Sequence, residues 1–271
     1  MNIEIYSPVR PNSLIKKIWG VSLESFISYQ MLPEASINLI FSLGSSFPGL
    51  KGSLIQNSVH SSQNFCFLSG LHTKPVSFSS SCSSYVMAVE MHPMAVSALF
   101  GIPCSEVENK VINGELILEN INQVEDKLLG PGTFTEKAKW LENYLHSKIN
   151  ETSELSIAAK MNAAISKMHT NLLHGKKVDM QDYTGYSRMH THRLATQWLG
   201  LSPKKYLRLQ QFISTLDDLH FTQHLSADIA AINGFFDQSH FNRIFRGFTE
   251  ITPKQYRKQK SDMAGQLFST Y

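Results

Sequence analysis

The chain has 271 residues, of which 42% are hydrophobic, and a formal net charge of +3 at pH 7. This length supports two domains with buried cores. The best apolar run, residues 85–91, is short and interrupted by Glu90, which argues against a membrane-spanning helix. The N-terminus shows no basic region followed by an apolar stretch, so we expect a cytoplasmic protein.

The first third of the chain has the pattern of short β-strands. Its segments mix β-branched, aromatic and polar residues, and prolines and glycines separate them. Residues 45–62 are rich in Gly and Ser and are expected to be a loop. The spacing predicts a sandwich or barrel. The predicted strands are residues 3–6, 14–21, 25–29, 37–43, 64–68, 76–80 and 84–91.

After His92 the pattern becomes helical. Pro93 is suited to the first turn of a short helix that reaches Phe100. A second helix is predicted over residues 133–149, where Thr133 and Glu136 have the spacing of a capping box. The polar segment 150–153 follows. We therefore expect an N-terminal β-rich domain with flanking helices at residues 1–152 and an all-α domain at residues 153–271, an α+β chain overall.

The second half opens with a predicted helix over residues 155–173. A short helix at residues 178–184, the turn Gly185-Tyr186-Ser187 and a helix at residues 188–199 then indicate a helix-turn-helix unit, at about residues 176–200. Thr191 and Ala195 are small for inward-facing positions of its second helix.

A connecting helix is predicted from Pro203 to His220. Its apolar residues recur on one face, and it would be about 26 Å long at 1.5 Å per residue. That length suits a spacer that holds two recognition helices on one side of a DNA duplex, where successive major-groove faces lie about 34 Å apart. The residues of this face are Tyr206, Leu209, Phe212, Ile213, Leu216 and Leu219.

A second helix-turn-helix is predicted at about residues 225–250. Ser226 is placed to cap a short helix whose apolar stripe ends at the turn signal Asn233-Gly234. In the next helix, apolar residues at three- and four-residue intervals indicate one buried face. The free face is polar and cationic, as a helix in a major groove requires. The buried face holds Phe241, Ile244, Phe245 and Phe248.

Charge is distributed unevenly between the two halves. Residues 161–271 hold 14 Lys/Arg and 8 Asp/Glu, whereas residues 1–160 hold 11 and 14. The positive potential therefore lies on the half with the predicted helix-turn-helix units, where it would attract phosphate.

These C-terminal motifs resemble the signature of the AraC/XylS family of bacterial transcription regulators. The family usually has Gly three residues before the closing proline, where this chain has Glu250; we expect a helix cap that avoids the left-handed conformation. The residues that carry the resemblance are Ile229-Ala230, Gly234-Phe235, Asp237-Gln238-Ser239, Phe241, Arg243, Phe245-Arg246, Thr252-Pro253 and Tyr256-Arg257.

The resemblance indicates which positions face DNA. The expected base contacts are Arg188, Met189, His192 and Arg193 in the first copy and Gln238, Ser239, Asn242 and Arg243 in the second. Arg suits guanine, Asn and Gln suit adenine, and Met suits a thymine methyl group. Lys204, Lys254 and Arg257 lie beside the closing prolines and are expected to contact phosphate, which positions the protein without specifying sequence.

The N-terminal half resembles a poorly characterised domain that precedes some AraC-type DNA-binding domains. By analogy it implies a module that binds a small-molecule effector or forms a homodimer. The residues behind this weaker resemblance are Leu32-Pro33-Glu34, the segment 38–44, Gly70, and the stretch from Val89 through His92-Pro93 to Gly101-Ile102-Pro103.

Catalysis and cofactors find no support in the sequence. No nucleophile elbow, phosphate-binding glycine loop or HExxH motif is present, so we expect neither an enzyme nor a cofactor. His60, His72 and His92 lack the close spacing of a metal site. The cysteines are odd in number and widely spaced, which suits buried, reduced thiols: Cys66, Cys82 and Cys104.

Two alternatives remain open at this stage. In one, the N-terminal domain is an enzymatic or metal-binding module that the C-terminal domain localises on DNA. In the other, the chain is a protein-interaction adaptor with a degenerate DNA-binding fold, an interpretation that Thr191, Ala195 and Glu250 permit.

Overall fold

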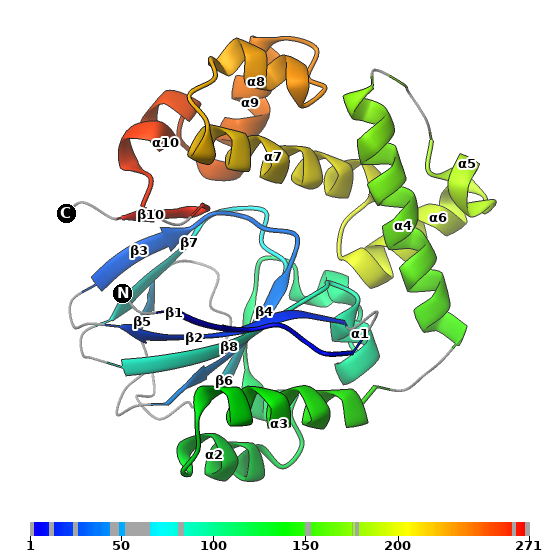
Figure 1. The fold of residues 1–271 in the computed structure, drawn as a ribbon. Helices are drawn as coiled ribbons and strands as arrows, with labels where there is room; N and C mark the ends of the chain where they lie inside the picture. The colour runs from blue at the N-terminus through cyan, green and yellow to red at the C-terminus, as the bar shows by residue number, and fades with distance from the viewer. Residues whose placement is uncertain are drawn as a thin grey trace. The chain divides into compact units, whose positions relative to one another are not determined.

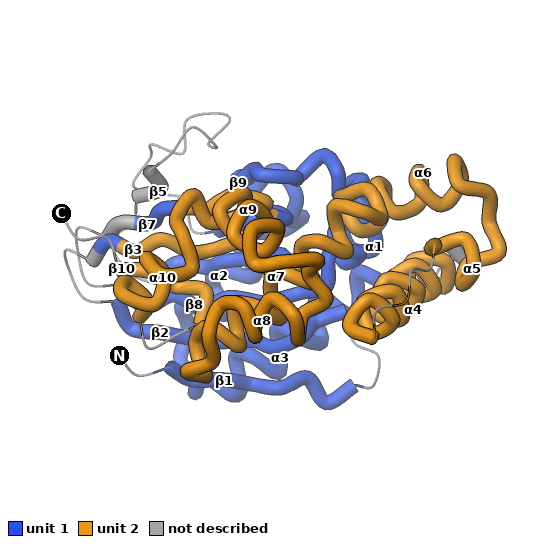
Figure 2. Tube along the Cα trace, turned by 90° about the horizontal axis from the view of Figure 1, so that it is seen from above, with its two compact units in different colours: residues 1–28, 36–71, 77–151 blue, residues 29–35, 72–76, 152–271 orange. Residues whose placement is uncertain are grey.

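A computed structural model describes residues 3–10, 14–23, 27–43, 49–51, 66–80, 84–149, 153–174, 176, 179–261 and 264–268. The chain divides into two compact units, coloured separately in Figure 2. Unit 1 comprises residues 1–28, 36–71 and 77–151, and unit 2 comprises residues 29–35, 72–76 and 152–271. The fold class predicted from the sequence is confirmed, with a sheet region in the N-terminal half and a helical C-terminal half (Figure 1).

Unit 1 is built on a six-stranded antiparallel sheet, ordered β1-β2-β8-β4-β6-β9. In register, Ile18 of β2 lies opposite Val89 of β8, and Leu39 of β4 lies opposite the same residue from the other side. The strands are β1 Ile3–Tyr6, β2 Ile15–Leu23, β4 Ile37–Ser42, β6 Cys66–Ser69, β8 Ser84–Met91 and β9 Val111–Asn113.

The central strand β8 explains where the core of unit 1 lies. Residues 86–89 of β8 are all buried, because this strand is flanked on both sides and packed on both faces. Branched and aromatic residues suit such positions. Fully buried residues on the other strands of this sheet include Ile18, Ile37, Leu39, Phe41, Phe67 and Leu68.

Helices complete unit 1. They are α1 Ala95–Phe100, α2 Ile121–Leu129 and α3 Phe134–Ser147, with 3-10 turns at Cys104–Val107 and Gly114–Leu116. The predicted capping box is confirmed at the start of α3, where the Glu136 N–H donates to Thr133 Oγ1 over 3.3 Å and its carboxylate accepts from the Thr133 N–H at 2.8 Å. α3 contacts β1 and β2.

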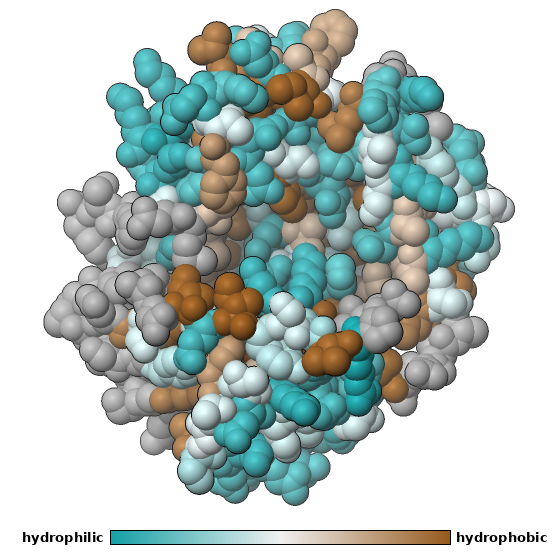
Figure 3. Space-filling model, viewed as in Figure 1, coloured by the Kyte–Doolittle hydropathy of each residue, from teal (hydrophilic) through white to brown (hydrophobic). Residues whose placement is uncertain are grey.

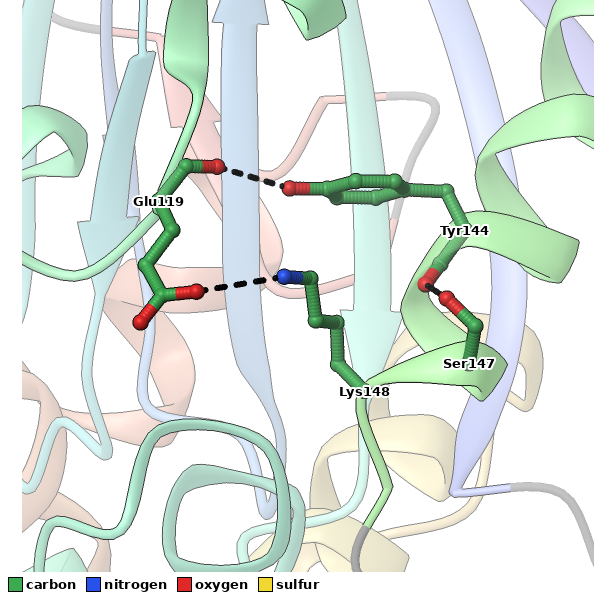
Figure 4. A network of polar contacts seen from close by, with 4 residues as sticks. All are labelled: Glu119, Tyr144, Ser147 and Lys148. Atoms are coloured by element: carbon green, nitrogen blue, oxygen red, sulfur yellow. Dashed lines mark hydrogen bonds and ion pairs between the residues drawn. The ribbon is translucent and has the colours of Figure 1, made fainter.

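A small polar network ties α3 to the segment before α2 (Figure 4). Tyr144 donates its hydroxyl to the backbone carbonyl of Glu119 over 3.0 Å, and the Lys148 ammonium lies 3.3 Å from the Glu119 carboxylate. Ser147 donates to the carbonyl of Tyr144 over 2.7 Å. Beside this network, a hollow of about 320 Å³ is lined by apolar residues, among them Leu99, Phe100 and Ile117, and by the polar residues Glu119, Tyr144, Ser147 and Lys148.

Unit 2 contains seven helices of the described chain, α4 to α10. They are α4 Ser153–Leu173, α5 Gln181–Thr184, α6 Arg188–Leu199, α7 Pro203–Phe221, α8 Ser226–Ile232, α9 Gln238–Thr249 and α10 Pro253–Gln259. The predicted α6 is confirmed at both ends, and the connecting helix α7 extends one residue beyond the prediction.

The C-terminal strand of unit 2 was not predicted. β10 Gln266–Phe268 pairs antiparallel with Tyr29–Met31 of β3 Ile27–Met31, so a segment from the first half of the chain joins the helical unit. The Leu32 N–H adds a hydrogen bond of 2.7 Å to the Gly265 carbonyl.

Several predictions need correction. Ser226 is the first residue of α8 and does not cap it, because Leu225 takes the cap position with extended backbone and no side-chain hydrogen bond. Residues 49–51, expected as loop, form β5 Gly49–Lys51 and pair with β7 Val76–Ser80. Glu250 adopts the left-handed conformation with φ 63°, contrary to the cap predicted for it.

Other predictions fall on residues outside the described ranges, among them Cys82, His60 and Val178. Cys66 and Cys104 are free and buried. Burial raises the pKa of the Cys104 thiol to about 12, which keeps it protonated and unreactive. Across the described ranges, no helix combines the length and hydrophobicity that a bilayer crossing requires.

Candidate DNA-binding surface

The first helix-turn-helix is formed by α5 and α6. Gly185 adopts a left-handed conformation with φ 71° and ends α5, and Ser187 then caps α6 by accepting from the His190 N–H over 3.3 Å. Only glycine takes this conformation at little cost, so the tight turn follows from the sequence. The cap fixes which face of α6 turns inward: Thr191, Leu194, Ala195, Trp198 and Leu199 are buried.

Two features of the interior accompany Thr191 and Ala195, the small inward-facing residues of α6. The hydroxyl groups of Thr184 and Thr191 lie 3.3 Å apart and share a hydrogen bond within the interior. Trp198 is only 4% exposed, so the buried face of α6 that holds Ala195 also holds one large ring. A small residue in a core is tolerated when its neighbours fill the space it leaves.

The outward face of α6 holds the four residues expected to contact bases. Arg188, Met189, His192 and Arg193 are all exposed. Arg188 and His192 line one hollow of about 410 Å³ together with Lys204 at the start of α7. The cationic groups predicted for base contact and for phosphate contact in this copy therefore open onto the same concavity.

The second helix-turn-helix is formed by α8 and α9. Asn233 and Gly234 make the turn, with φ 69° at Gly234, and Asp237 caps α9 by accepting from the His240 N–H over 2.6 Å. A Cβ atom on Gly234 would lie 2.8 Å from the Leu172 carbonyl oxygen, so both space and conformation require glycine there.

Aromatic rings fill the interior of this second copy. Phe241 and Phe245 are almost completely buried, with ring centroids 5.7 Å apart, and Phe212 of α7 and Tyr256 of α10 pack on Phe245 at 5.5 and 5.9 Å. Such edge-to-face contacts add to the free energy of burial. The predicted core positions Phe241, Phe245 and Leu194 are confirmed.

The outward face of α9 is polar and cationic as predicted. Gln238, Ser239, Asn242 and Arg243 are all exposed. Ser239 and Arg243 line a shallow hollow of about 530 Å³ with Phe236, Asp237 and His240.

The two copies repeat in register, 50 residues apart. Ser187 and Asp237 both cap the recognition helix, and Pro203 and Pro253 both begin the helix that follows. Fifty residues also separate two buried tyrosines, Tyr206 and Tyr256, and two left-handed helix caps, Gly200 and Glu250. The repeat extends from backbone conformation to core positions, so both copies present the same face of their second helix to solvent.

The residues expected at phosphates differ in setting. Lys204 and Lys254 are exposed in the first turns of α7 and α10. Arg257 is half-buried, and its guanidinium donates to the backbone carbonyl of His224. This hydrogen bond joins α10 to the segment before α8, so part of the hydrogen-bonding capacity of the guanidinium is used within the protein.

Residues 180–259 match a protein family described as a helix-turn-helix domain. This segment is an AraC-type helix-turn-helix domain. Residues 12–113, ahead of the AraC-type domain, match a domain of unknown function (DUF6597).

Relatives of the AraC-type domain include an uncharacterized HTH-type transcriptional regulator of Staphylococcus aureus (strain MSSA476), which is 35% identical over 79 residues. That match covers 29% of this chain and 11% of the relative. The Bacillus subtilis regulator YbfP is 27% identical over 118 residues, 44% of this chain and 31% of YbfP. The chain thus matches well under half the length of these relatives.

Solved structures that are similar to this chain include the following two. ToxT from Vibrio cholerae aligns with 95% of this chain and 98% of its own, at 12% identity and a TM-score of 0.49. An AraC-type transcriptional regulator from Chromobacterium violaceum aligns with 40% of this chain and 96% of its own, at 27% identity and a TM-score of 0.35.

One residue of this surface, Phe236, is not indicated by the sequence patterns. Phe236 directly precedes the cap Asp237 and is 92% exposed, although its neighbour Phe235 is buried. Two adjacent phenylalanines suggest a core segment, and only the three-dimensional turn separates an inward ring from an outward one. The 50-residue repeat could have prompted the comparison with Tyr186.

Proposed function

We propose that this chain is a sequence-specific DNA-binding transcription regulator of the AraC type, which inserts α6 and α9 into the major groove of double-stranded DNA. The observation that carries the proposal is that each recognition helix has one exposed polar face and one buried face. The eight residues expected to face DNA are exposed, whereas Thr191 and Leu194 of α6 and Phe241 and Phe245 of α9 are buried.

The proposed roles follow from side-chain chemistry. Arg188, Arg193 and Arg243 can each donate two hydrogen bonds to guanine O6 and N7. Gln238 and Asn242 match the donor and acceptor of adenine. His192 and Ser239 add single hydrogen bonds, and Met189 contacts a thymine methyl group. Lys204, Lys254 and Arg257 contact phosphate, which contributes affinity without sequence preference.

The linker helix α7 supports a bipartite site. Its 19 residues correspond to about 28 Å, and it contacts α4 and α6 of one copy and α8, α9 and α10 of the other. Its buried face holds the residues Tyr206, Leu209, Phe212, Leu216 and Leu219. A packed spacer of this length suits recognition helices in successive major grooves about 34 Å apart, so one chain would read two half-sites.

Selection of bound fragments from random duplex DNA tests the proposal. We expect an enriched sequence with two conserved segments about one helical turn apart, and affinity that falls steeply between low and moderate salt. Enrichment of no sequence, with salt-insensitive binding, would favour the adaptor interpretation.

We further propose that the N-terminal half, residues 1–152, regulates the DNA-binding half, residues 153–271, through a small-molecule effector or a homodimer. The hollow beside Tyr144 and Phe100 is a place where an effector could bind. A thermal-shift screen that finds no stabilising metabolite, together with a monomeric sedimentation profile, would count against this regulation.

A further inference from the structure

We propose that Phe236 contacts the 5-methyl group of a thymine in the major groove, and so acts as a specificity-determining residue beside the polar residues of α9. This inference rests on the proposed function and adds a base that the site must contain. It starts from exposure: Phe236 is 92% exposed and Met189 is 85% exposed, the highest values among the large hydrophobic side chains of the described ranges.

These two residues occupy matching ends of the two copies. Phe236 lies one residue before the cap of α9, and Met189 is the second residue of α6. Apolar side chains are visible at the surface over α8 and α9 in Figure 3. Isolated exposed hydrophobic residues are common on proteins. Here, however, the two most exposed ones both lie at the N-terminal end of a recognition helix, and this shared position requires an explanation.

Folding of the domain makes no use of the Phe236 ring. Phe235 takes the inward position and packs on Phe241 at 5.3 Å and on His240 at 5.6 Å. Because Asp237 must cap α9, the backbone is extended there and Phe236 is left facing solvent. Truncation of this side chain should therefore leave the fold intact.

The first copy shows what a structural role at this position looks like. Tyr186, 50 residues before Phe236, is half-buried and lies against the His190 ring at 4.8 Å. The Lys160 ammonium lies 4.8 Å from the centre of the Tyr186 ring. The equivalent position is thus packed in one copy and open in the other.

The residues around Phe236 indicate which part of a ligand its ring would contact. It lines the same hollow as Ser239 and Arg243, two residues proposed to contact bases. The carboxylate of Asp237, also in this hollow, accepts from the His240 N–H at the helix N-terminus, which offsets its charge. A base edge that reaches Ser239 and Arg243 would meet the ring, and the thymine methyl group is the apolar feature of a base in the major groove.

The test uses the full chain and the duplex selected from random DNA. Deoxyuridine replaces each thymine in turn, which removes the methyl group and keeps every hydrogen-bonding group. We expect one replacement to weaken wild-type binding about fourfold, the equilibrium equivalent of one buried methyl group, and to leave binding by Phe236→Ala unchanged. Phe236→Leu should retain part of the effect. Phe221→Ala removes another exposed ring, 72% exposed at the end of α7, and should bind like the wild type.

Three results would overturn the inference while the proposed function stands. These are wild-type affinity for Phe236→Ala, a deoxyuridine effect that persists in this variant, and a loss of affinity that is equal for all sequences, which would place the ring against the DNA backbone. Absence of sequence preference in the wild type is a different outcome, because it contradicts the proposed function itself.

Discussion

The side-chain amide of Gln211 donates a hydrogen bond of 2.8 Å to the backbone carbonyl of Asn233. Gln211 lies in the middle of the linker helix α7, and Asn233 forms the turn of the second helix-turn-helix. Asn233 in turn donates to Asp218 of α7 over 2.6 Å. Gln211 and Asn233 are almost fully buried, at 4% and 3% exposed, so these bonds fix the angle between the linker and the second copy.

Gln211→Leu should destabilise the protein by about 1–3 kcal/mol, because it leaves the buried carbonyl of Asn233 without its donor. Binding to the half-site of the second copy should weaken as well. Urea unfolding measures the first effect and DNA titration the second. Gln210→Ala, at the neighbouring half-buried position, is the control and should change the unfolding midpoint little. Equal effects of the two substitutions would mean that the Asn233 contact is unimportant.

Glu250→Gly should stabilise the protein by roughly 0.5–1 kcal/mol. Glu250 has a left-handed conformation with φ 63°, which costs a residue with a Cβ about 1–2 kcal/mol. Glycine removes this cost, but its larger conformational entropy in the unfolded chain offsets part of the stabilisation. Gly200 already occupies the equivalent position of the first copy. Glu250→Ala keeps the Cβ and should give no gain, so similar midpoints for the two variants in urea would rule out backbone strain as the cause.

The repeat of recognition helices was predictable because local signals agree with the tertiary fold. In α6 and α9, cap residues, glycine turns and apolar residues at helical spacing all point to the same boundaries. The backbone conformation at the C-terminal cap of α9 was harder to predict. The sequence shows that Glu250 replaces a glycine, but it does not show that the backbone there is still left-handed, with the Glu250 N–H bonded to the Arg246 carbonyl and Thr249 buried beside it.

Long-range pairing was beyond reach of sequence patterns. β10 is three residues long and pairs with residues about 235 positions earlier, and nothing in its composition identifies β3 as its partner. The exposure of Phe236 was missed for a related reason, since the choice of which phenylalanine turns inward depends on the Asp237 cap and on the ring of Phe241.

Arg243→Ala and Lys254→Ala should have different consequences for DNA binding. Arg243 lies on the outward face of α9, and its loss should cost about 1–3 kcal/mol on the selected site and relax preference at one base pair. Lys254 lies beside Pro253, and its loss should weaken all sequences alike and lower the salt slope by about one. Titrations of specific and random duplexes at several salt concentrations measure both. Equal losses on both duplexes for both variants would refute this division of roles.

Stability should fall as the pH is lowered from about 6.5 to 4. Burial lowers the pKa of His72 to about 4, below its ordinary value near 6.5, so the unfolded chain takes up a proton in this range and the folded chain does not. His72 alone should contribute a loss of roughly 1–2 kcal/mol by pH 5. His72→Phe should flatten the pH dependence of the unfolding free energy, which urea unfolding at several pH values measures. An unaltered slope in His72→Phe would show that other groups dominate.

The claim that both helix-turn-helix copies read DNA is tested most directly with a selected site in which five base pairs are inserted between the two half-sites. The affinity of the full chain for this lengthened site is measured. Half a helical turn moves the second half-site to the opposite face of the duplex, out of reach of a second recognition helix held by α7. We predict that affinity drops at least about tenfold, toward that of a single half-site. Unchanged affinity for the lengthened site would show that only one of the two copies reads DNA.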